Sequence, residues 1–279
     1  MLSFPNCKIN LGLHVVRRRD DGYHDLETIF LPVALRDRLE IEPAQQFSFA
    51  QEGIAIGCGA EQNIVVKAYR LMQNECGDAI GPVAIRLTKN IPFGAGLGGG
   101  SSDAAFTLTM LNELFAIGLD APQLRHLAAR LGADCAFFVD NVPAYATGIG
   151  DQLTPLGLNP IEGYALLLVK PDEAVSTAEA YRGVTPRNKS ATPPPTDLRQ
   201  AVGRPIAEWR ELIVNDFEES VFPQHPLLAE IKRQLYAAGA LYAAMSGSGS
   251  TVYGIFSTSA DHHTVEAQMA KYGQLFFLK

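Results

Sequence analysis

A glycine-rich loop at residues 91–103 limits what this chain can fold into more than any other segment does. Five glycines fall within the seven residues from Gly94 to Gly100, and two serines and a helical pattern follow at once. Glycine loses much conformational entropy on folding, so it is concentrated where the backbone must adopt positive φ or approach a ligand closely. The following helix begins with unsatisfied N–H groups and the positive end of its dipole, which favour an anion. We therefore predict that this loop binds phosphate.

The best known phosphate-binding loops do not fit the surrounding sequence. The spacing Gly-x-Gly-x-x-Gly from Gly94 matches the dinucleotide fingerprint, but that fold needs a second strand with an acidic end, and here helix follows helix. A Walker A loop requires a lysine where Ser101 stands. The protein-kinase motifs are incomplete, because no His-Arg-Asp occurs and Asn215–Phe217 is followed by glutamate. A dinucleotide oxidoreductase and a flexible glycine linker are the alternatives to a phosphate site of another family.

Composition and charge indicate a folded protein that does not bind nucleic acid. Of its 279 residues, 47% are hydrophobic and 19% are charged, and the formal net charge is −7. The one dense basic run, Arg17–Arg19, is followed directly by Asp20 and Asp21, which is typical of a solvated turn. The four cysteines lack Cys-x-x-Cys spacing, so we expect free thiols and neither a protein metal site nor a disulfide.

We expect a cytoplasmic chain without a membrane partner. Lys8 and Asn10 interrupt the first apolar run, so no signal peptide is predicted. The longest aliphatic run, residues 165–169, is too short to cross a bilayer.

Hydrophobic periodicity predicts strands and helices in mixed order. Strands are expected at 3–16, 27–35, 37–49, 54–57, 83–88 and 163–170 and as a strand–turn–strand at 241–256. Helices are expected at 63–74, 122–131 and 226–238 and after the glycine loop, with Ser101 or Ser102 as its cap, and residues 174–181 are expected to be a loop that enters a helix. A further helix and a short strand should close the chain. Residues 144–154 are expected to form a glycine-rich connection, and residues 185–205, with the proline run 193–195, an irregular surface segment.

Several polar side chains could carry chemistry. Along the first strand Lys8 and Asn10 fall on the polar face, which suits either a half-exposed strand or a strand that lines a cleft. Tyr23 and His24 follow a turn, where they could be ordinary surface residues or could stack on a base. Asp134 lies in an apolar setting and is either a buried structural carboxylate or a base that needs a cation such as Lys8.

Three motifs in this order resemble those of the GHMP kinases, which are named for galactokinase and the homoserine, mevalonate and phosphomevalonate kinases. They are Pro5–Leu11, the loop and helix start Pro92–Ala105, and Ser246–Ser250, and they span almost the whole chain. The resemblance implies an α+β fold of two domains. The first, residues 1–155, would be like domain 2 of ribosomal protein S5 and hold the ATP-binding loop. The second, residues 156–279, would be ferredoxin-like.

Within this family the chain resembles the branch that phosphorylates the 2-hydroxyl of cytidine diphosphate methylerythritol, in the methylerythritol phosphate route to isoprenoid precursors. The resemblance rests on Arg19–Leu26, Gly98–Ala105 and Leu131–Asp134. Cys7 and Ala136 stand where alanine and proline are usual, and neither change removes a group that the reaction needs.

The resemblance also implies the site residues. Asp134 matches the family's base and Lys8 its partner, whose ammonium stabilises an ionised carboxylate. ATP, with Mg²⁺, would be held by Pro92, Gly94, Ala95, Gly96, Leu97, Gly98, Gly99, Gly100, Ser101 and Ser102. The hydroxyl of Ser101 or Ser102 could reach the ion, for which no protein cage is expected. The acceptor would be held by Asn10, Tyr23, His24, Lys89, Tyr181, Gly247 and Ser248, with Lys89 on a phosphate and Tyr181 where phenylalanine is common.

Two further interpretations compete. A GHMP kinase could act on another small alcohol, such as homoserine or mevalonate, but those acceptors have no base for Tyr23 and His24 to stack on. A non-catalytic nucleotide-binding regulator could share the fold, but it would not need both Lys8 and Asp134.

Overall fold

The computed structural model describes residues 1–187 and 196–278. The chain packs into two compact units, and each is made of three separate stretches of the sequence. Unit 1 comprises Met1–Lys8, Pro32–Phe93 and Gly98–Val142, and unit 2 comprises Ile9–Leu31, Gly94–Leu97 and Pro143–Lys279. The glycine loop is therefore divided between them. The predicted domains, 1–155 and 156–279, are consecutive ranges of the sequence, whereas the two units are interleaved along it. The predicted boundary stays a prediction.

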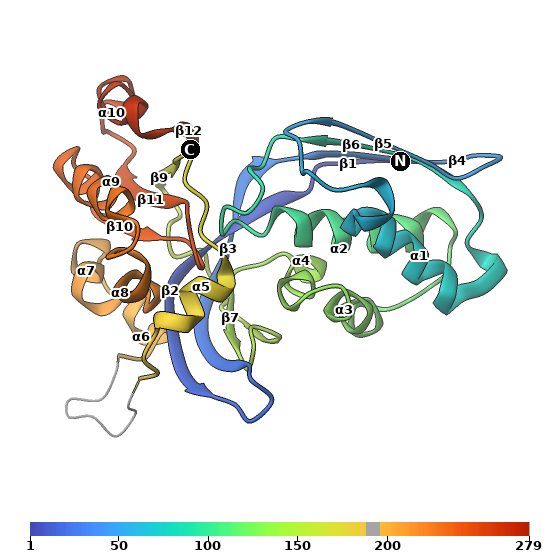
Figure 1. The fold of residues 1–279 in the computed structure, drawn as a ribbon, viewed down its shortest axis with the longest axis horizontal. Helices are drawn as coiled ribbons and strands as arrows, with labels where there is room; N and C mark the ends of the chain where they lie inside the picture. Colours follow the sequence, from blue (N-terminus) through green and yellow to red (C-terminus); the bar gives the residue numbers. More distant parts are fainter. Residues whose placement is uncertain (188–195, 279) are drawn as a thin grey trace. The chain divides into compact units, whose positions relative to one another are not determined.

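Unit 1 is built on a four-stranded sheet of order β1-β4-β6-β5. The strands are β1 (Leu2–Ser3), β4 (Arg38–Pro43), β6 (Val83–Lys89) and β5 (Ser48–Gly53). β5 runs parallel to β6, and the other pairs are antiparallel. Alternate apolar side chains of β4 and β6 are buried against the helices α1 (Ile64–Cys76), α2 (Gly99–Leu114) and α3 (Ala121–Ala129). Figure 1 shows α1 and α2 lying along one face of this sheet.

Unit 2 contains a fully antiparallel sheet of order β10-β11-β9-β12. Its strands are β9 (Tyr164–Lys170), β10 (Tyr242–Met245), β11 (Val252–Ser257) and β12 (Gln274–Leu278). The helices α9 (Pro226–Ala237) and α10 (His262–Met269) follow the first and third strands and share one core with the sheet (Figure 1). This β-α-β-β-α-β order confirms the predicted ferredoxin-like part.

A third sheet has the order β2-β3-β7-β8. Its long hairpin consists of β2 (Asn6–Arg18) and β3 (His24–Arg36), joined at a turn in which Gly22 has a φ of 86°. The short strands β7 (Ala144–Thr147) and β8 (Gln152–Pro155) complete it. The sequence predicted only a connection at residues 144–154. Strands of four residues are too short for a periodic pattern to stand out there.

Two other local predictions need correction. Residues 54–57 are not a strand, because β5 ends at Gly53, whose φ of 78° brings it against the carbonyl of Lys89. Within the expected irregular segment 185–205, a short helix forms, and the proline run 193–195 lies outside the described residues. The remaining helices are α4 (Phe137–Asp140), α5 (Thr177–Gly183), α6 (Leu198–Ala201), α7 (Trp209–Leu212) and α8 (Phe217–Val221), with 3-10 turns at Ala60–Gln62, Gly77–Ala79, Ala133–Cys135, Ile206–Glu208 and Ala270–Tyr272.

No helix in the described part of the chain combines the length and the apolar composition that crossing a bilayer requires.

Candidate active site

The glycine loop has the backbone geometry that its composition predicts. Gly94, Gly96 and Gly98 all have positive φ, of 62°, 74° and 68°. At Gly96 a Cβ atom would lie 2.1 Å from the carbonyl oxygen of Ser246, so no other residue fits there. α2 begins directly after Gly98, with free N–H groups in its first turn. The loop thus presents backbone donors and a helix N-terminus, which together can bind an anion.

Lys8 and Asp134 meet in unit 1, as predicted. The Nζ atom of Lys8 lies 3.3 Å from Oδ2 of Asp134, and the side chains are 4% and 34% exposed. A Cβ atom at Gly98 would lie 3.2 Å from the aliphatic stem of Lys8, so the ion pair sits at the foot of the glycine loop. The buried ammonium and half-buried carboxylate can hold a substrate hydroxyl and accept its proton.

The two serines of the loop differ in their surroundings. Ser101 lies beside the Cys135 thiol, and burial raises the pKa of that thiol to about 12, so that it is neutral and unreactive. The hydroxyl of Ser102 is buried and has no hydrogen-bond partner among the described residues. An unpaired buried hydroxyl at a helix start is free to take a ligand, which fits the ion that accompanies ATP. No group of three or more metal-ligating side chains occurs in the described ranges. All four cysteines are free.

Lys89 lies in a buried cluster of charges in unit 1. We expected its ammonium to contact a phosphate, but it is 3% exposed and pairs with Asp37 and, at 2.7 Å, with Asp103 of α2. Asp37 also accepts the backbone N–H groups of Asn90 and Ile91, at 2.6 and 2.9 Å. The cluster therefore fixes the segment that enters the glycine loop to the helix that leaves it.

Burial and the neighbouring charges shift two pKa values in this cluster. Burial raises the pKa of Asp103, and the nearby Asp37 adds to this effect against the opposing ammonium. Burial alone would lower the pKa of Lys89, but its two carboxylate partners outweigh that effect and raise it. The sequence did not reveal this cluster, because Asp37 and Lys89 are 52 positions apart.

In unit 2, Asn10 is held from several directions. Its side-chain amide donates to the hydroxyl of Thr28 at 2.9 Å, and its backbone carbonyl accepts the hydroxyl of Tyr253 at 2.8 Å. Its backbone N–H donates to the hydroxyl of Ser246 at 3.3 Å. Ser246 in turn donates to the carbonyl of Gly96 at 2.9 Å, and so connects Asn10 with the glycine loop.

The predicted base-binding residues lie partly together. His24 stacks on Tyr181 with ring centroids 4.8 Å apart and planes 23° apart. Tyr23 is 62% exposed, so its ring is open to a ligand. Burial, and then the charge of Arg18, lowers the pKa of His24, which keeps the imidazole neutral and able both to donate and to accept a hydrogen bond.

The loop 246–250 carries the last predicted residues. Gly247 has a φ of 56°, and a Cβ atom there would lie 3.4 Å from Oδ1 of Asn10. The hydroxyl of Ser248 lies 3.1 Å from that of Thr177, at the start of α5. The structure thus brings Gly247 to Asn10 and Ser248 to the helix that bears Tyr181.

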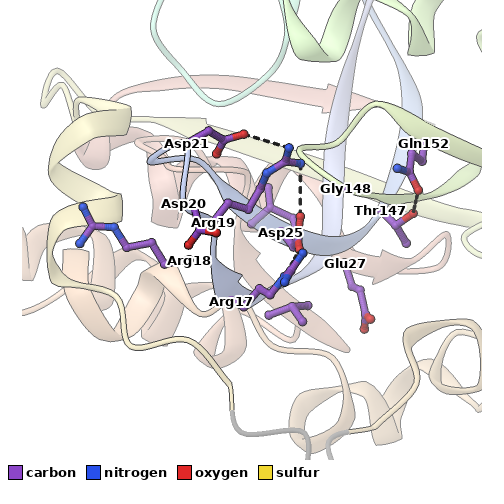
Figure 2. A pocket seen from close by; sticks show the side chains of 12 residues that line it. Arg17, Arg18, Arg19, Asp20, Asp21, Asp25, Glu27, Thr147, Gly148 and Gln152 are labelled. Carbon is purple, nitrogen blue, oxygen red and sulfur yellow. Dashed lines mark hydrogen bonds and ion pairs between the residues drawn. The ribbon is translucent and has the colours of Figure 1, made fainter.

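A polar cavity of about 640 Å³ lies beside the tip of the β2–β3 hairpin (Figure 2). Arg17 bonds Asp25, and Arg19 pairs with Asp21 at 2.9 Å and with Asp25 at 3.5 Å. These pairs neutralise most of the basic run, but the expected solvated turn is right only in part, because Arg17 and Arg18 end strand β2 and only Arg19 lies beyond it. The cavity is also lined by Glu27, Thr147 and Gln152, none of which the sequence singled out.

Comparisons with known proteins agree with this geometry. The family models described as "GHMP kinases N terminal domain" and "GHMP kinases C terminal" match residues 63–148 and 198–275. A Bacteroides thetaiotaomicron protein named 4-diphosphocytidyl-2-C-methyl-D-erythritol kinase is 52% identical over 92% of both chains. One of the same name from Cytophaga hutchinsonii is 45% identical over 94% of both.

Solved structures give the same result. The crystal structure of a 4-(cytidine 5'-diphospho)-2C-methyl-D-erythritol kinase superposes with a TM-score of 0.84 at 34% identity and covers 100% of this chain and 98% of its own. The Methanococcus jannaschii mevalonate kinase shares the fold, with a TM-score of 0.75 at 12% identity over 100% of this chain and 96% of its own. The chain belongs to the GHMP kinases and, within them, to the family of 4-diphosphocytidyl-2-C-methyl-D-erythritol kinases.

Proposed function

We propose that this protein transfers the γ-phosphoryl group of ATP to the 2-hydroxyl of 4-diphosphocytidyl-2-C-methyl-D-erythritol. The products are the 2-phosphate and ADP, and the reaction belongs to the methylerythritol phosphate pathway of isoprenoid precursor biosynthesis. The observation that carries this proposal is the Lys8–Asp134 pair at the foot of the glycine loop, in a chain half identical to kinases of that name.

Asp134 is the proposed base. Its carboxylate accepts the proton of the 2-hydroxyl as the oxygen attacks the γ-phosphorus, and Lys8 stabilises the negative charge that develops on that oxygen. Phosphoryl transfer needs positioning and charge stabilisation more than covalent chemistry, so a rigid pair suits the reaction.

The glycine loop is the proposed triphosphate site. The backbone N–H groups between Gly94 and Ser102, together with the N-terminus of α2, neutralise phosphate oxygens. Mg²⁺ bound with ATP would supply further charge neutralisation there, and the hydroxyl of Ser102 is the side chain that we propose to hold it.

The acceptor side is assigned to unit 2. His24 and Tyr181 form one wall for the cytosine ring, and Tyr23 supplies an exposed ring that can close on it. Asn10 and the loop residues Gly247 and Ser248 would hold the methylerythritol part. We assign Lys89 to the support of the glycine loop, because both of its carboxylate partners are buried with it.

One measurement tests this function. Purified protein with ATP and Mg²⁺ is given the cytidine diphosphate substrate, homoserine or mevalonate in parallel, and ADP release is followed. We expect turnover on the first alone, because only that acceptor carries a base for Tyr23, His24 and Tyr181. No turnover on it, or faster turnover on either of the others, would contradict the proposal.

A further inference from the structure

The segment Asn215–Glu218 ends in the first two residues of α8 and is tied to strand β2 by its backbone. The N–H of Leu13 donates to the carbonyl of Val214 at 3.0 Å, and the N–H of Asp216 donates to the carbonyl of Leu13 at 2.8 Å. Asn215 is only 3% exposed. The side chains of this segment therefore start from a fixed backbone in unit 2.

The side chain of Asn215 spans a turn of the 246–250 loop. Its Nδ2 atom donates to the carbonyls of Met245 and Gly247, both at 2.8 Å, and its Oδ1 atom accepts the N–H of Phe217 at 3.0 Å. Glu218 adds a bond from the same segment, since it accepts the N–H of Met245 at 2.8 Å. An amide with both hydrogens and its oxygen in use has one orientation, so the turn on either side of Ser246 is held in one place.

This turn contacts residues of the proposed reaction. Ser246, between the two carbonyls, bonds Gly96 of the glycine loop and Asn10 of β2. The backbones of Gly96 and Ser246 approach so closely that a Cβ atom on the glycine would lie 2.1 Å from the serine carbonyl oxygen. A small displacement of the turn therefore moves both Gly96 and Asn10.

Phe217, in contrast to Asn215, packs against Tyr181. Its side chain is 2% exposed, and its ring meets Tyr181 edge to face with centroids 4.8 Å apart and planes 82° apart. Tyr181 stacks its own ring on His24. The phenyl ring thus fixes the orientation of the Tyr181 ring, and with it the His24–Tyr181 wall.

We propose that Asn215 and Phe217, two positions apart, are positioning residues with separate duties. Asn215 sets the 245–247 turn, and with it Gly96 and Asn10, for the transfer step. Phe217 sets the ring of Tyr181 for recognition of the cytidine base. This assignment rests on the proposed function and deepens it, because neither residue is assigned a contact with substrate or ATP.

The test is a split of kinetic parameters between two variants of the full chain. Asn215→Asp keeps the shape but cannot donate to the two carbonyls, and we expect kcat to fall by about 10- to 100-fold with the KM for the cytidine substrate within about twofold. Phe217→Leu keeps an apolar side chain without the ring edge, and we expect that KM to rise by about 3- to 10-fold with kcat nearly unchanged. Glu219→Gln, an exposed change on the same helix, is the matched control.

A merely structural role would not produce this split. If both variants lowered kcat alone, in proportion to the loss of folded protein seen by circular dichroism, the proposal would be overturned. If Asn215→Asp does not fold, Asn215→Ser keeps one donor and should show the kcat loss to a smaller degree, and an unchanged kcat there would also overturn the assignment. An inactive wild-type protein contradicts the proposed function instead, so the two failures are distinguishable.

Discussion

The ends and the middle of the glycine loop are supported by different chemistry. In unit 1 the support is ionic, because Lys89 is buried between Asp37 and Asp103 and joins the loop's entry to α2. In unit 2 the support is neutral, because hydroxyl and amide groups of Ser246, Tyr253 and Asn215 bond backbone atoms of Gly96, Asn10 and the 245–247 turn.

This difference predicts different responses to mutation and to pH. Removing one partner from a buried ion cluster leaves an uncompensated charge, at a cost of about 3–5 kcal/mol. Removing one partner of a buried neutral hydrogen bond costs about 1–3 kcal/mol. Only the ionic support should respond to pH near neutrality, since hydroxyl and amide groups do not titrate there.

The largest effect is expected where a charge in unit 1 acts directly on the substrate. Asp134→Asn should lower kcat by about 10²- to 10⁴-fold, because an amide cannot accept the proton of the 2-hydroxyl. The fold and the binding of ATP should be retained, because the side chain is 34% exposed and the oxygen of the new amide can still accept a hydrogen bond from the buried ammonium of Lys8. Steady-state kinetics with calorimetric ATP titration check this, and Asp140→Asn on nearby α4 is the control. Turnover near the wild-type rate would remove Asp134 as the base.

The second largest effect is expected for the stability of the ionic support around Lys89. Lys89→Met should lower the free energy of unfolding by about 3–5 kcal/mol at pH 7, because it leaves Asp37 and Asp103 buried without a cation. The loss should be smaller at pH 5, where a carboxyl whose pKa is raised by burial takes up a proton more readily. Urea unfolding at both pH values measures it, with the exposed Lys67→Met as the control. A loss below about 1 kcal/mol would show that the cluster is not an ionic support.

The neutral support should give a smaller and different result. Tyr253→Phe removes the hydroxyl that bonds the Asn10 carbonyl, in a fully buried position, and should lower the free energy of unfolding by about 1–3 kcal/mol. Burial raises the pKa of Tyr253 well above its usual value, so the loss should be the same from pH 5 to pH 9. Tyr164→Phe in the same unit is the comparison. A loss that varied with pH would break the distinction between the two supports.

The sequence predicted the Lys8–Asp134 pair but not either support. Lys8 and Asp134 lie in motifs whose spacing is recognisable, and the long elements β2, β3 and α2 have clear periodicity. Asp37 was only the first residue of the expected strand 37–49, and Asn215 served only to exclude another kinase class. Their partners are 52 and about 30 positions away, and only tertiary packing brings such residues together. Local pattern carries no information on these distant pairs. The strands β7 and β8 were missed for another reason, because four residues are too few to show a period.

The smallest change in stability is expected for Asp103→Asn, and it tests the charge balance of the ionic support. Because burial raises the pKa of Asp103, the folded state keeps its proton in a range where the unfolded chain, with an ordinary aspartate pKa of 3.8, has released it. The folded state then binds more protons than the unfolded state, so this group makes the protein less stable as pH rises from about 4 toward the folded pKa. Asp103→Asn removes this effect and leaves Lys89 and Asp37 as a balanced pair, so stability at pH 7 should stay within about 1 kcal/mol of wild type.

The quantity to measure is therefore the difference in the free energy of unfolding between the Asp103→Asn variant and wild type, as a function of pH. The variant should gain stability relative to wild type as pH rises from 4.5 to 8, in urea unfolding at matched ionic strength. Lys89 does not contribute in this window, because its raised pKa lies above its usual 10.5 and its stabilisation is lost only at higher pH. A difference that is constant with pH would mean that Asp103 is ionised throughout, and the charge balance assigned to the ionic support would have to be redrawn as a triad with one excess negative charge.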